Sequence, residues 1–166
     1  MQTRRGGAAA KAGHDLDIVV TAWEATLEIG EAPSAARAEL TADATSLRVR
    51  TGTGGMQALG DDDKDSIHQT IDDEVLKRRD ISFRSTRVEA EHEGGRLHAE
   101  GDLTLAGETR PIAFDLAIGG GGELTAAALV TQSAWGMKPY SALFGALKVK
   151  DEVLVVLEGH LQPQSR

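Results

Sequence analysis

Residues 96–105 read Arg-Leu-His-Ala-Glu-Gly-Asp-Leu-Thr-Leu, with an apolar or small residue at every second position. The positions between them hold Arg, His, Glu, Asp and Thr. Because successive side chains of a β-strand point to opposite faces, this alternation predicts a strand with one buried and one solvent-exposed face. Sheets built from such strands are typically antiparallel.

The same alternation recurs along most of the chain on both sides of this stretch. Its phase changes near Thr21-Ala22, which predicts a bulge or a sharp bend there, and it slips again before Leu47. Further alternating segments lie at 16–20, 23–29, 38–49, 81–90, 112–118, 124–130 and 153–161. We therefore predict a mainly β protein, an antiparallel barrel or sandwich of about eight strands.

One segment, Asp61–Arg79, departs from this pattern and is the clear helix candidate. It begins with three Asp residues and ends with Lys-Arg-Arg. This order of charges interacts favourably with the helix dipole. Ile67, Ile71 and Val75 recur every fourth residue and form a narrow apolar stripe. We expect this helix to lie across the sheet or to cap one end of a barrel.

The length and composition fit a single domain. The chain has 166 residues, of which 40% are apolar, enough to bury one core. No linker divides it, so we assign one domain to residues 13–162 and a flexible tail to residues 1–12. This tail carries no long apolar run, so no secretory signal is visible and a cytoplasmic location is expected. The sequence leaves open whether the protein forms a homodimer.

The net charge of −8 limits the classes of partner. Nucleic-acid affinity comes mainly from basic patches, so an acidic chain predicts no nucleic-acid partner. An anionic membrane surface is expected to repel it as well. No run of about eighteen apolar residues exists to span a bilayer. The absence of Cys excludes disulfides and thiolate chemistry.

Catalytic and metal sites find little support in the sequence. The five His residues show no zinc-helix spacing, and no Gly-x-Ser-x-Gly elbow is present. His14 next to Asp15 is the one local candidate, since a carboxylate can orient an imidazole. A structural hydrogen bond explains that pair as well. We predict no metal, no cofactor and no catalytic residue.

Small residues are frequent at the positions predicted to face inward. An eight-stranded barrel is either filled by its side chains or holds one small ligand, and small residues favour the open form. The alternative is that the segment Trp135–Phe144, or the helix, fills the space. The small inward positions are Ala25, Ala38, Ala42, Ala44, Ala99, Gly101, Ala126 and Ala128.

Several segments resemble motifs of the YceI family. Residues 101–112, Gly-Asp-Leu-Thr-Leu-Ala-Gly-Glu-Thr-Arg-Pro-Ile, are similar to the family's Gly-Asp-Leu-Thr, apolar residue, Gly-x-Thr-Arg-Pro. Ile81–Thr86, Ala134–Gly136 and Lys150–Val153 resemble further family segments in the same order. The chain departs from the family in having Arg79-Asp80 where Tyr-Pro is usual.

This resemblance implies a lipocalin-like antiparallel barrel that binds a polyisoprenoid or similar long apolar molecule, without catalysis. The implied partner is a polyisoprenoid, an isoprenoid quinone or a fatty-acid-like ligand. Within the barrel we expect Trp135 and Tyr140 at the mouth, where amphipathic rings meet a polar head group. The other expected lining residues are Trp23, Leu27, Leu40, Phe83, Leu103, Phe114, Leu116, Val130 and Phe144.

Two other functions stay open at this stage. The same barrel can serve an enzyme, such as an isomerase or cyclase of an apolar substrate, which needs an inward carboxylate or His with a shifted pKa. The chain can also be an interaction module with a filled core that acts through its surface.

Overall fold

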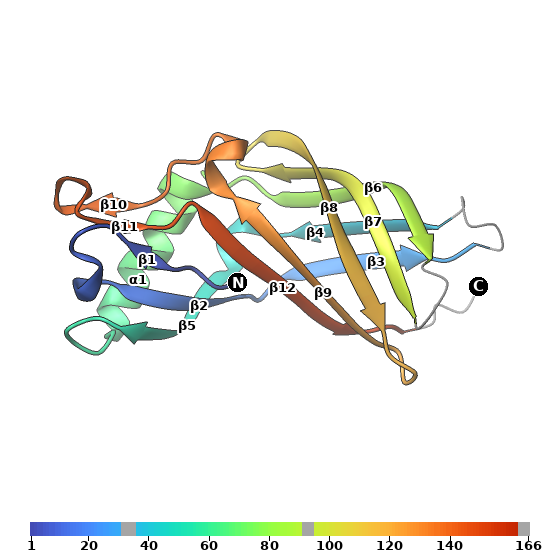
Figure 1. Ribbon diagram of the computed structural model, residues 1–166, viewed down its shortest axis with the longest axis horizontal. Coiled ribbons are helices and arrows are strands. Elements are labelled where there is room, and N and C mark those ends of the chain that lie inside the picture. Colours follow the sequence, from blue (N-terminus) through green and yellow to red (C-terminus); the bar gives the residue numbers. More distant parts are fainter. Residues whose placement is uncertain (31–35, 91–94, 163–166) are drawn as a thin grey trace.

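The computed structural model describes residues 1–30, 36–90 and 95–162, and they form a mainly β fold (Figure 1). The strands are β1 (Arg5–Gly6), β2 (His14–Val20), β3 (Trp23–Glu28), β4 (Arg37–Ala42), β5 (Leu47–Gly54), β6 (Ile81–Ala90), β7 (Arg96–Leu105), β8 (Glu108–Ile118), β9 (Glu123–Thr131), β10 (Ser141–Ala142), β11 (Leu147–Val149) and β12 (Glu152–His160). The helix α1 spans Asp61–Thr70 and continues as a π-turn over Ile71–Val75. Short 3₁₀ turns lie at Ala10–Ala12, Ala44–Ser46, Gln132–Trp135 and Leu143–Gly145.

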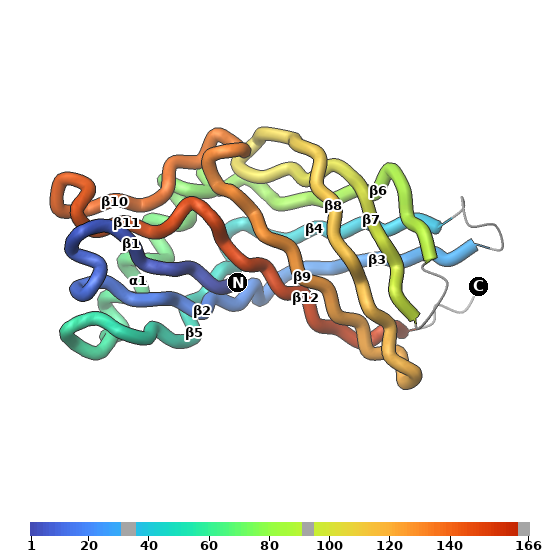
Figure 2. The backbone as a smooth tube through the Cα atoms, viewed as in Figure 1, coloured from blue at the N-terminus to red at the C-terminus, as the bar shows by residue number. Residues whose placement is uncertain are grey.

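Seven of these strands form one curled antiparallel sheet, in the order β12-β9-β8-β7-β6-β4-β3. The curl is visible in Figures 1 and 2, where β12 and β9 cross in front of β3 and β4. A two-stranded pair, β2-β5, and a three-stranded sheet, β1-β11-β10, lie at one end. The predicted antiparallel, mainly β architecture is confirmed. The main sheet is a half-barrel with β3 and β12 as its two edges.

The predicted bend at Thr21-Ala22 is confirmed. Here the chain leaves β2, which pairs with β5, and enters β3, which pairs with β4. Ser46 holds the corner, because its carbonyl oxygen accepts hydrogen bonds from the backbone N–H and the hydroxyl of Thr21. The side-chain oxygen of Ser46 also accepts from the N–H of Ala22. The second phase change before Leu47 is the 3₁₀ turn at the same corner.

The helix begins at Asp61, as predicted, and its regular part is shorter than predicted. Lys77 and Arg78 both adopt positive φ, so the chain turns away before Arg79. Ile67, Ile71 and Val75 pack against the buried core, as the apolar stripe predicted. The helix therefore covers one end of the molecule.

The register of the main sheet places the alternating apolar residues of every strand on one concave face. Leu40 lies opposite Phe83, Phe83 opposite Leu103, and Leu116 opposite Ala126. A β-bulge between Ser85 and Arg87 keeps the two halves of β6 in phase with β7. The sequence alternation thus reports a single inward face that runs across all seven strands.

The residues predicted as a flexible N-terminal tail are paired with the rest of the fold. β1 pairs with β11, and Gln2 bridges both Asp17 of β2 and Leu154 of β12. Thr3 is buried. Gln2 therefore bridges β2 and β12, and Arg5–Gly6 pair with β11, which corrects the assignment of residues 1–12 to a flexible tail.

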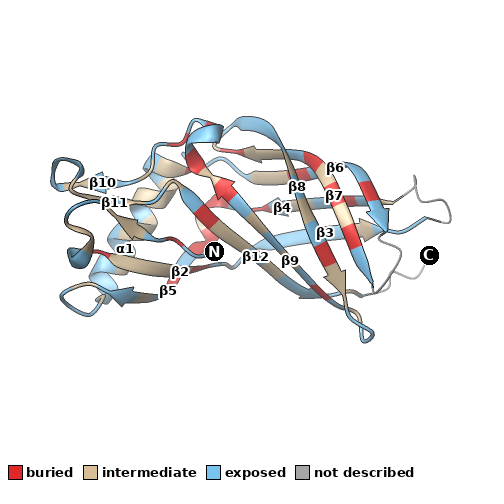
Figure 3. Ribbon diagram, in the orientation of Figure 1, coloured by how far each residue is buried: buried red, intermediate tan, exposed pale blue. Residues whose placement is uncertain are grey.

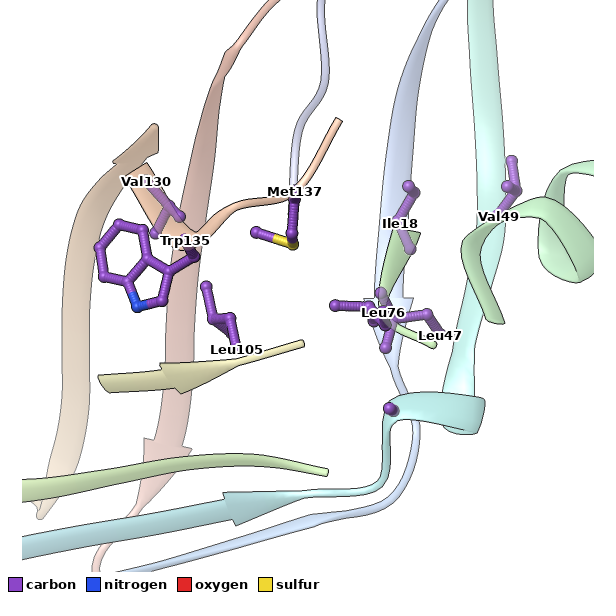
Figure 4. Packing of buried hydrophobic residues seen from close by; sticks show 9 residues of the cluster. Ile18, Leu47, Val49, Leu76, Leu105, Val130, Trp135 and Met137 are labelled. Atoms are coloured by element: carbon purple, nitrogen blue, oxygen red, sulfur yellow. The ribbon is translucent and has the colours of Figure 1, made fainter. Parts of the chain in front are cut away.

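Two buried apolar clusters divide the molecule. The first, which we call the helix end, lies under α1, and Figure 4 shows its side chains converging from strands, helix and loop. Its buried members are Ile18, Ala44, Leu47, Val49, Leu76, Leu105, Val130, Trp135 and Met137. The second, the sheet end, lies on the concave face of the main sheet alone. Its buried members are Ala38, Phe83, Val88, Leu97, Ala99, Leu116 and Leu124.

Candidate functional site

The concave face at the sheet end gathers most of the residues expected to line a ligand site. Phe83 and Leu116 are buried there, and the other four are half-buried against them. All six come from β3, β4, β6, β7 and β8, so the curl of the sheet brings them together. The six residues are Leu27, Leu40, Phe83, Leu103, Phe114 and Leu116.

The ring pair Phe83 and Phe114 forms the centre of this face. The ring centroids lie 5.1 Å apart with the planes tilted by 57°, a favourable arrangement for aromatic rings. Gly101 makes the pair possible: a Cβ there would lie 2.7 Å from the Phe83 ring and 2.4 Å from the carbonyl oxygen of Arg84. The space beside Gly101 is therefore filled by its neighbours. This contradicts the expectation that the small residue at this position leaves room for a ligand.

The small inward residues fall into two groups. Ala44 and Ala99 have no exposed surface, and Ala44 belongs to the helix end, where it is part of the packed core. Ala126 and Ala128 of β9 are only half-buried, although they lie on the concave face opposite Leu157 and Val155 of β12. Ala126 and Ala128 thus keep exposed apolar surface on the concave face.

Trp23 lies at the seam between the two edges of the main sheet. It is on β3 and is 43% exposed. Its ring reaches across to β12, where a Cβ on Gly159 would lie 3.7 Å from it. Between these strands the described residues form no hydrogen-bonded ladder. Trp23 therefore bridges the open side of the half-barrel, and Figure 3 shows β3 as largely exposed.

Trp135 and Val130 belong to the helix end. Trp135 is buried, and its indole Nε1 donates a 2.8 Å hydrogen bond to the carbonyl oxygen of Leu103. Val130 is buried in the same cluster (Figure 4). Trp135 thus fills the core with its polar atom satisfied, so the expectation that it lies at a mouth is wrong.

Tyr140 and Phe144 lie outside the concave face. Both are exposed, Phe144 completely, in the segment that runs from Tyr140 through β10 to β11. That hairpin projects beyond the helix end (Figure 1). Period-two alternation does not extend through this loop, so the sequence could not place these rings.

The pair His14 and Asp15 does not form a catalytic dyad. His14 Nε2 lies 2.9 Å from the carbonyl oxygen of Gln57, whereas Asp15 accepts a 2.8 Å hydrogen bond from the backbone N–H of Arg5. That bond lowers the pKa of Asp15, and the nearby charges of Arg5 and Arg4 lower it further. Neighbouring side chains on β2 point to opposite faces, so the two groups serve separate structural contacts.

Polar chemistry is sparse near the concave face. A polar hollow of about 270 Å³ lies where β4 and β6 separate beside the β-bulge, and two arginines and a glutamate border it. Arg84 of this hollow pairs with Glu39 at 3.2 Å. In the described part of the chain, no group of three or more His, Asp or Glu side chains is placed to hold a metal ion. None of the described helices is long and apolar enough to cross a bilayer.

Comparison with known proteins identifies the fold family. The profile of the YceI-like domain matches residues 8–161. The chain belongs to the YceI-like family. This family has a barrel fold that binds hydrophobic ligands. No curated protein sequence matches the chain.

Solved structures show the same fold. The YceI protein of Campylobacter jejuni, crystallised with large solvent channels, superposes with a TM-score of 0.65 at 15% identity, covering 90% of this YceI-like chain and 86% of that protein. A mutant CJ YceI protein with a monobromobimane guest gives a TM-score of 0.68 at 14% identity, with the same coverage. Burkholderia cenocepacia BcnA gives 0.62 at 16% identity, covering 85% and 84%.

Some residues of the concave face were not among the expected lining. Leu157 of β12 lies opposite Ala126 of β9, and Leu161 lies just beyond β12; both pack against the sheet-end cluster. Val155 of β12 lies opposite Ala128 and packs against the helix-end cluster. Their alternation in the last strand was visible in the sequence and is the signal that could have found them. The pairing of β12 with β9, which the alternation does not report, places them on this face.

Proposed function

We propose that this YceI-like protein binds one long apolar molecule, an isoprenoid or a lipid of similar shape, along the concave face of its main sheet. The observation that carries the proposal is the half-burial of apolar side chains at the sheet end. In a closed core such side chains are covered completely, whereas Leu40, Phe114 and Ala126 keep surface that an apolar ligand can cover.

The chemistry of this face suits binding by burial. An alkyl or isoprenoid chain that hides roughly 300 Å² of apolar surface gains on the order of 7 kcal/mol, before ordering costs are subtracted. The face offers aromatic and branched side chains and few polar groups. This composition favours a polyisoprenoid, an isoprenoid quinone or a fatty-acid-like molecule over a sugar or a nucleotide.

No feature of the face calls for catalysis. His98 and Asp115, which lie 2.6 Å apart, are on the outer side of β7 and β8. The proposed role is therefore carriage or sequestration of the apolar molecule.

Two neighbouring alanines of β9 allow a matched test. Ala126 faces inward opposite Leu116 and Leu157, and Ala127 is exposed on the outer face. We expect Ala126→Trp to lower the amount of lipid that co-purifies with the protein by about tenfold or more, because the indole occupies the ligand's space. Ala127→Trp should leave it unchanged. Mass spectrometry of the organic extract measures both.

Circular dichroism and urea unfolding show whether each variant folds, and Ala126→Leu is a milder replacement if the Trp variant does not. Equal lipid retention by folded Ala126 and Ala127 variants would contradict the proposal. The absence of any apolar molecule from wild-type extracts, together with no uptake of an added polyisoprenol or fatty acid, would do so as well.

A further inference from the structure

The positive charge of the chain is concentrated in two segments that meet at the helix end. Residues 1–14 and 136–150 together hold six Lys or Arg residues and no Asp or Glu. The rest of the chain holds twelve basic against twenty-six acidic residues, a net charge of −14. The overall charge of −8 therefore conceals one basic region on an otherwise acidic molecule.

Strand pairing brings the two segments side by side. β1 pairs with β11 so that Gly6 lies opposite Lys148, and the N–H of Lys150 donates to the carbonyl oxygen of Arg4. The N–H of Ala9 donates to the carbonyl oxygen of Ala146 at 2.7 Å. The two segments, more than 120 positions apart in sequence, thus form one surface.

Alternation along β1 and β11 places the cations on one face. Lys148 and Lys150 are both exposed. Arg4, in the adjacent N-terminal segment, has a side chain that is 60% exposed on the same face. The side chain of Lys150 lies across Gly6, because a Cβ there would be 3.4 Å from its Cγ. Arg4 reaches Asp15 at 3.5 Å, whereas Lys11, Lys148 and Lys150 have no acidic partner among the described residues.

An apolar tip adjoins this basic face. Leu143 is 60% exposed and Phe144 is fully exposed, in the turn between β10 and β11. Both adopt left-handed backbone conformations, with φ of 52° and 54°. Residues other than Gly adopt this conformation at a cost, and such strain clusters at functional positions. The turn therefore exposes a Leu and a Phe to solvent, at the end of the hairpin formed by β10 and β11 (Figure 1).

We propose that this surface, which we call the basic tip (Arg4, Lys11, Leu143, Phe144, Lys148 and Lys150), docks the protein on the surface of a bilayer that contains anionic lipids. Exposed Phe and Leu insert at the boundary of head groups and acyl chains, and Lys and Arg around them are attracted by anionic head groups. The charge and the apolar tip complement the two layers of such a surface.

This docking differs from the binding of an apolar molecule inside the fold. The basic tip lies at the helix end, and the concave face lies at the sheet end. Either proposal can therefore fail while the other holds. The expectation of repulsion from an anionic membrane rested on the net charge, which does not report how the charges are distributed.

Vesicle flotation tests the proposal on the full chain. We expect the wild type to float with vesicles of phosphatidylcholine that contain about 30% phosphatidylglycerol, and to bind about tenfold less to phosphatidylcholine alone. Leu143→Ser combined with Phe144→Ser should lower binding to the mixed vesicles about tenfold. Lys148→Glu combined with Lys150→Glu should abolish the preference for the anionic lipid. Higher salt should likewise reduce the preference of the wild type for vesicles that contain this lipid.

The matched control lies on the outer face of the main sheet. Leu129 of β9 and Val156 of β12 are exposed apolar residues that do not belong to the basic tip, so Leu129→Ser combined with Val156→Ser should leave vesicle binding unchanged. Failure of the wild type to bind anionic vesicles overturns the proposal. An equal loss of vesicle binding in the Leu129→Ser and Val156→Ser control variant overturns it as well. Self-association through the tip, seen as a change of mass in sedimentation without vesicle binding, overturns it too.

Discussion

The helix end and the sheet end are built from the same kind of strand and differ in what covers them. At the helix end, α1 and the loop with Trp135 and Met137 lie over the apolar face of the strands. At the sheet end, one curved sheet supplies the whole described cluster, and many of its inward side chains are half-buried. A second layer of structure therefore turns an apolar strand face into a closed core.

This contrast separates stability from the proposed binding role. A closed core gains free energy from complete burial of its side chains, so its residues are costly to change. A half-covered face contributes less to folding and keeps apolar surface for another molecule. Substitutions that compare matched residues at the two ends test this division.

The largest expected effect compares the two tryptophans. Trp135 is buried at the helix end and hydrogen-bonded to Leu103, so Trp135→Ala should lower the free energy of unfolding by about 3–5 kcal/mol. Trp23 is 43% exposed at the seam, and Trp23→Ala should cost about 1 kcal/mol or less. Urea unfolding followed by circular dichroism measures both. Similar losses for the two variants would remove the contrast.

An intermediate effect is expected when a larger side chain is added to an alanine at each end. Ala44 has no exposed surface, and Ala44→Leu should destabilise the fold by about 2 kcal/mol through overpacking. Ala126 is half-buried, so Ala126→Leu should change the free energy of unfolding by less than about 0.5 kcal/mol. Thermal or urea unfolding distinguishes the two outcomes, and an equal cost would mean that the sheet end is as full as the helix end.

The smallest expected effect concerns the first strand, which is confined to the helix end. The carboxylate of Asp15 accepts a hydrogen bond from the backbone N–H of Arg5. Asp15→Ala should therefore lower the free energy of unfolding by about 1 kcal/mol at neutral pH. The pKa of this carboxyl is lowered in the fold, chiefly by that hydrogen bond. Its contribution is therefore complete above the ordinary Asp pKa of about 4 and is lost as the pH falls through the lowered value.

Unfolding of the wild type and the Asp15→Ala variant across an acid pH series measures this contribution. The difference between the two proteins should be constant at neutral pH and should shrink only in the acid range. A difference that stays constant down to the lowest pH would mean that the carboxylate charge does not carry the contact.

Much of the fold could be predicted because it depends on local patterns. The strand at 96–105, the corner at Thr21-Ala22 and the helix start at Asp61 all follow from alternation, phase changes and charge order. The motif at 101–112 folds as a hairpin in which Ala106 and Gly107 both adopt positive φ, as a two-residue turn requires.

The candidate site was predicted in part, and its errors have a common cause. Six of the expected residues share the sheet end, because alternation reports which face a strand residue occupies. Trp135, Tyr140 and Phe144 lie in segments without alternation. Val130 lies in an alternating strand but is covered at the helix end, and the space beside Gly101 is filled by Phe83 of the neighbouring strand. A one-dimensional pattern does not state what packs against a face.

The amino-acid sequence by itself determined the mainly antiparallel fold, the helix, the family and the inward face, since each depends on neighbours within a few residues or on an ordered set of motifs. Only the tertiary structure decided which part of that face is covered, how the first residues pair between β2 and β12, and that residues 1–14 meet residues 136–150. These features depend on contacts between distant segments, which form only when the chain folds and which no local periodicity encodes.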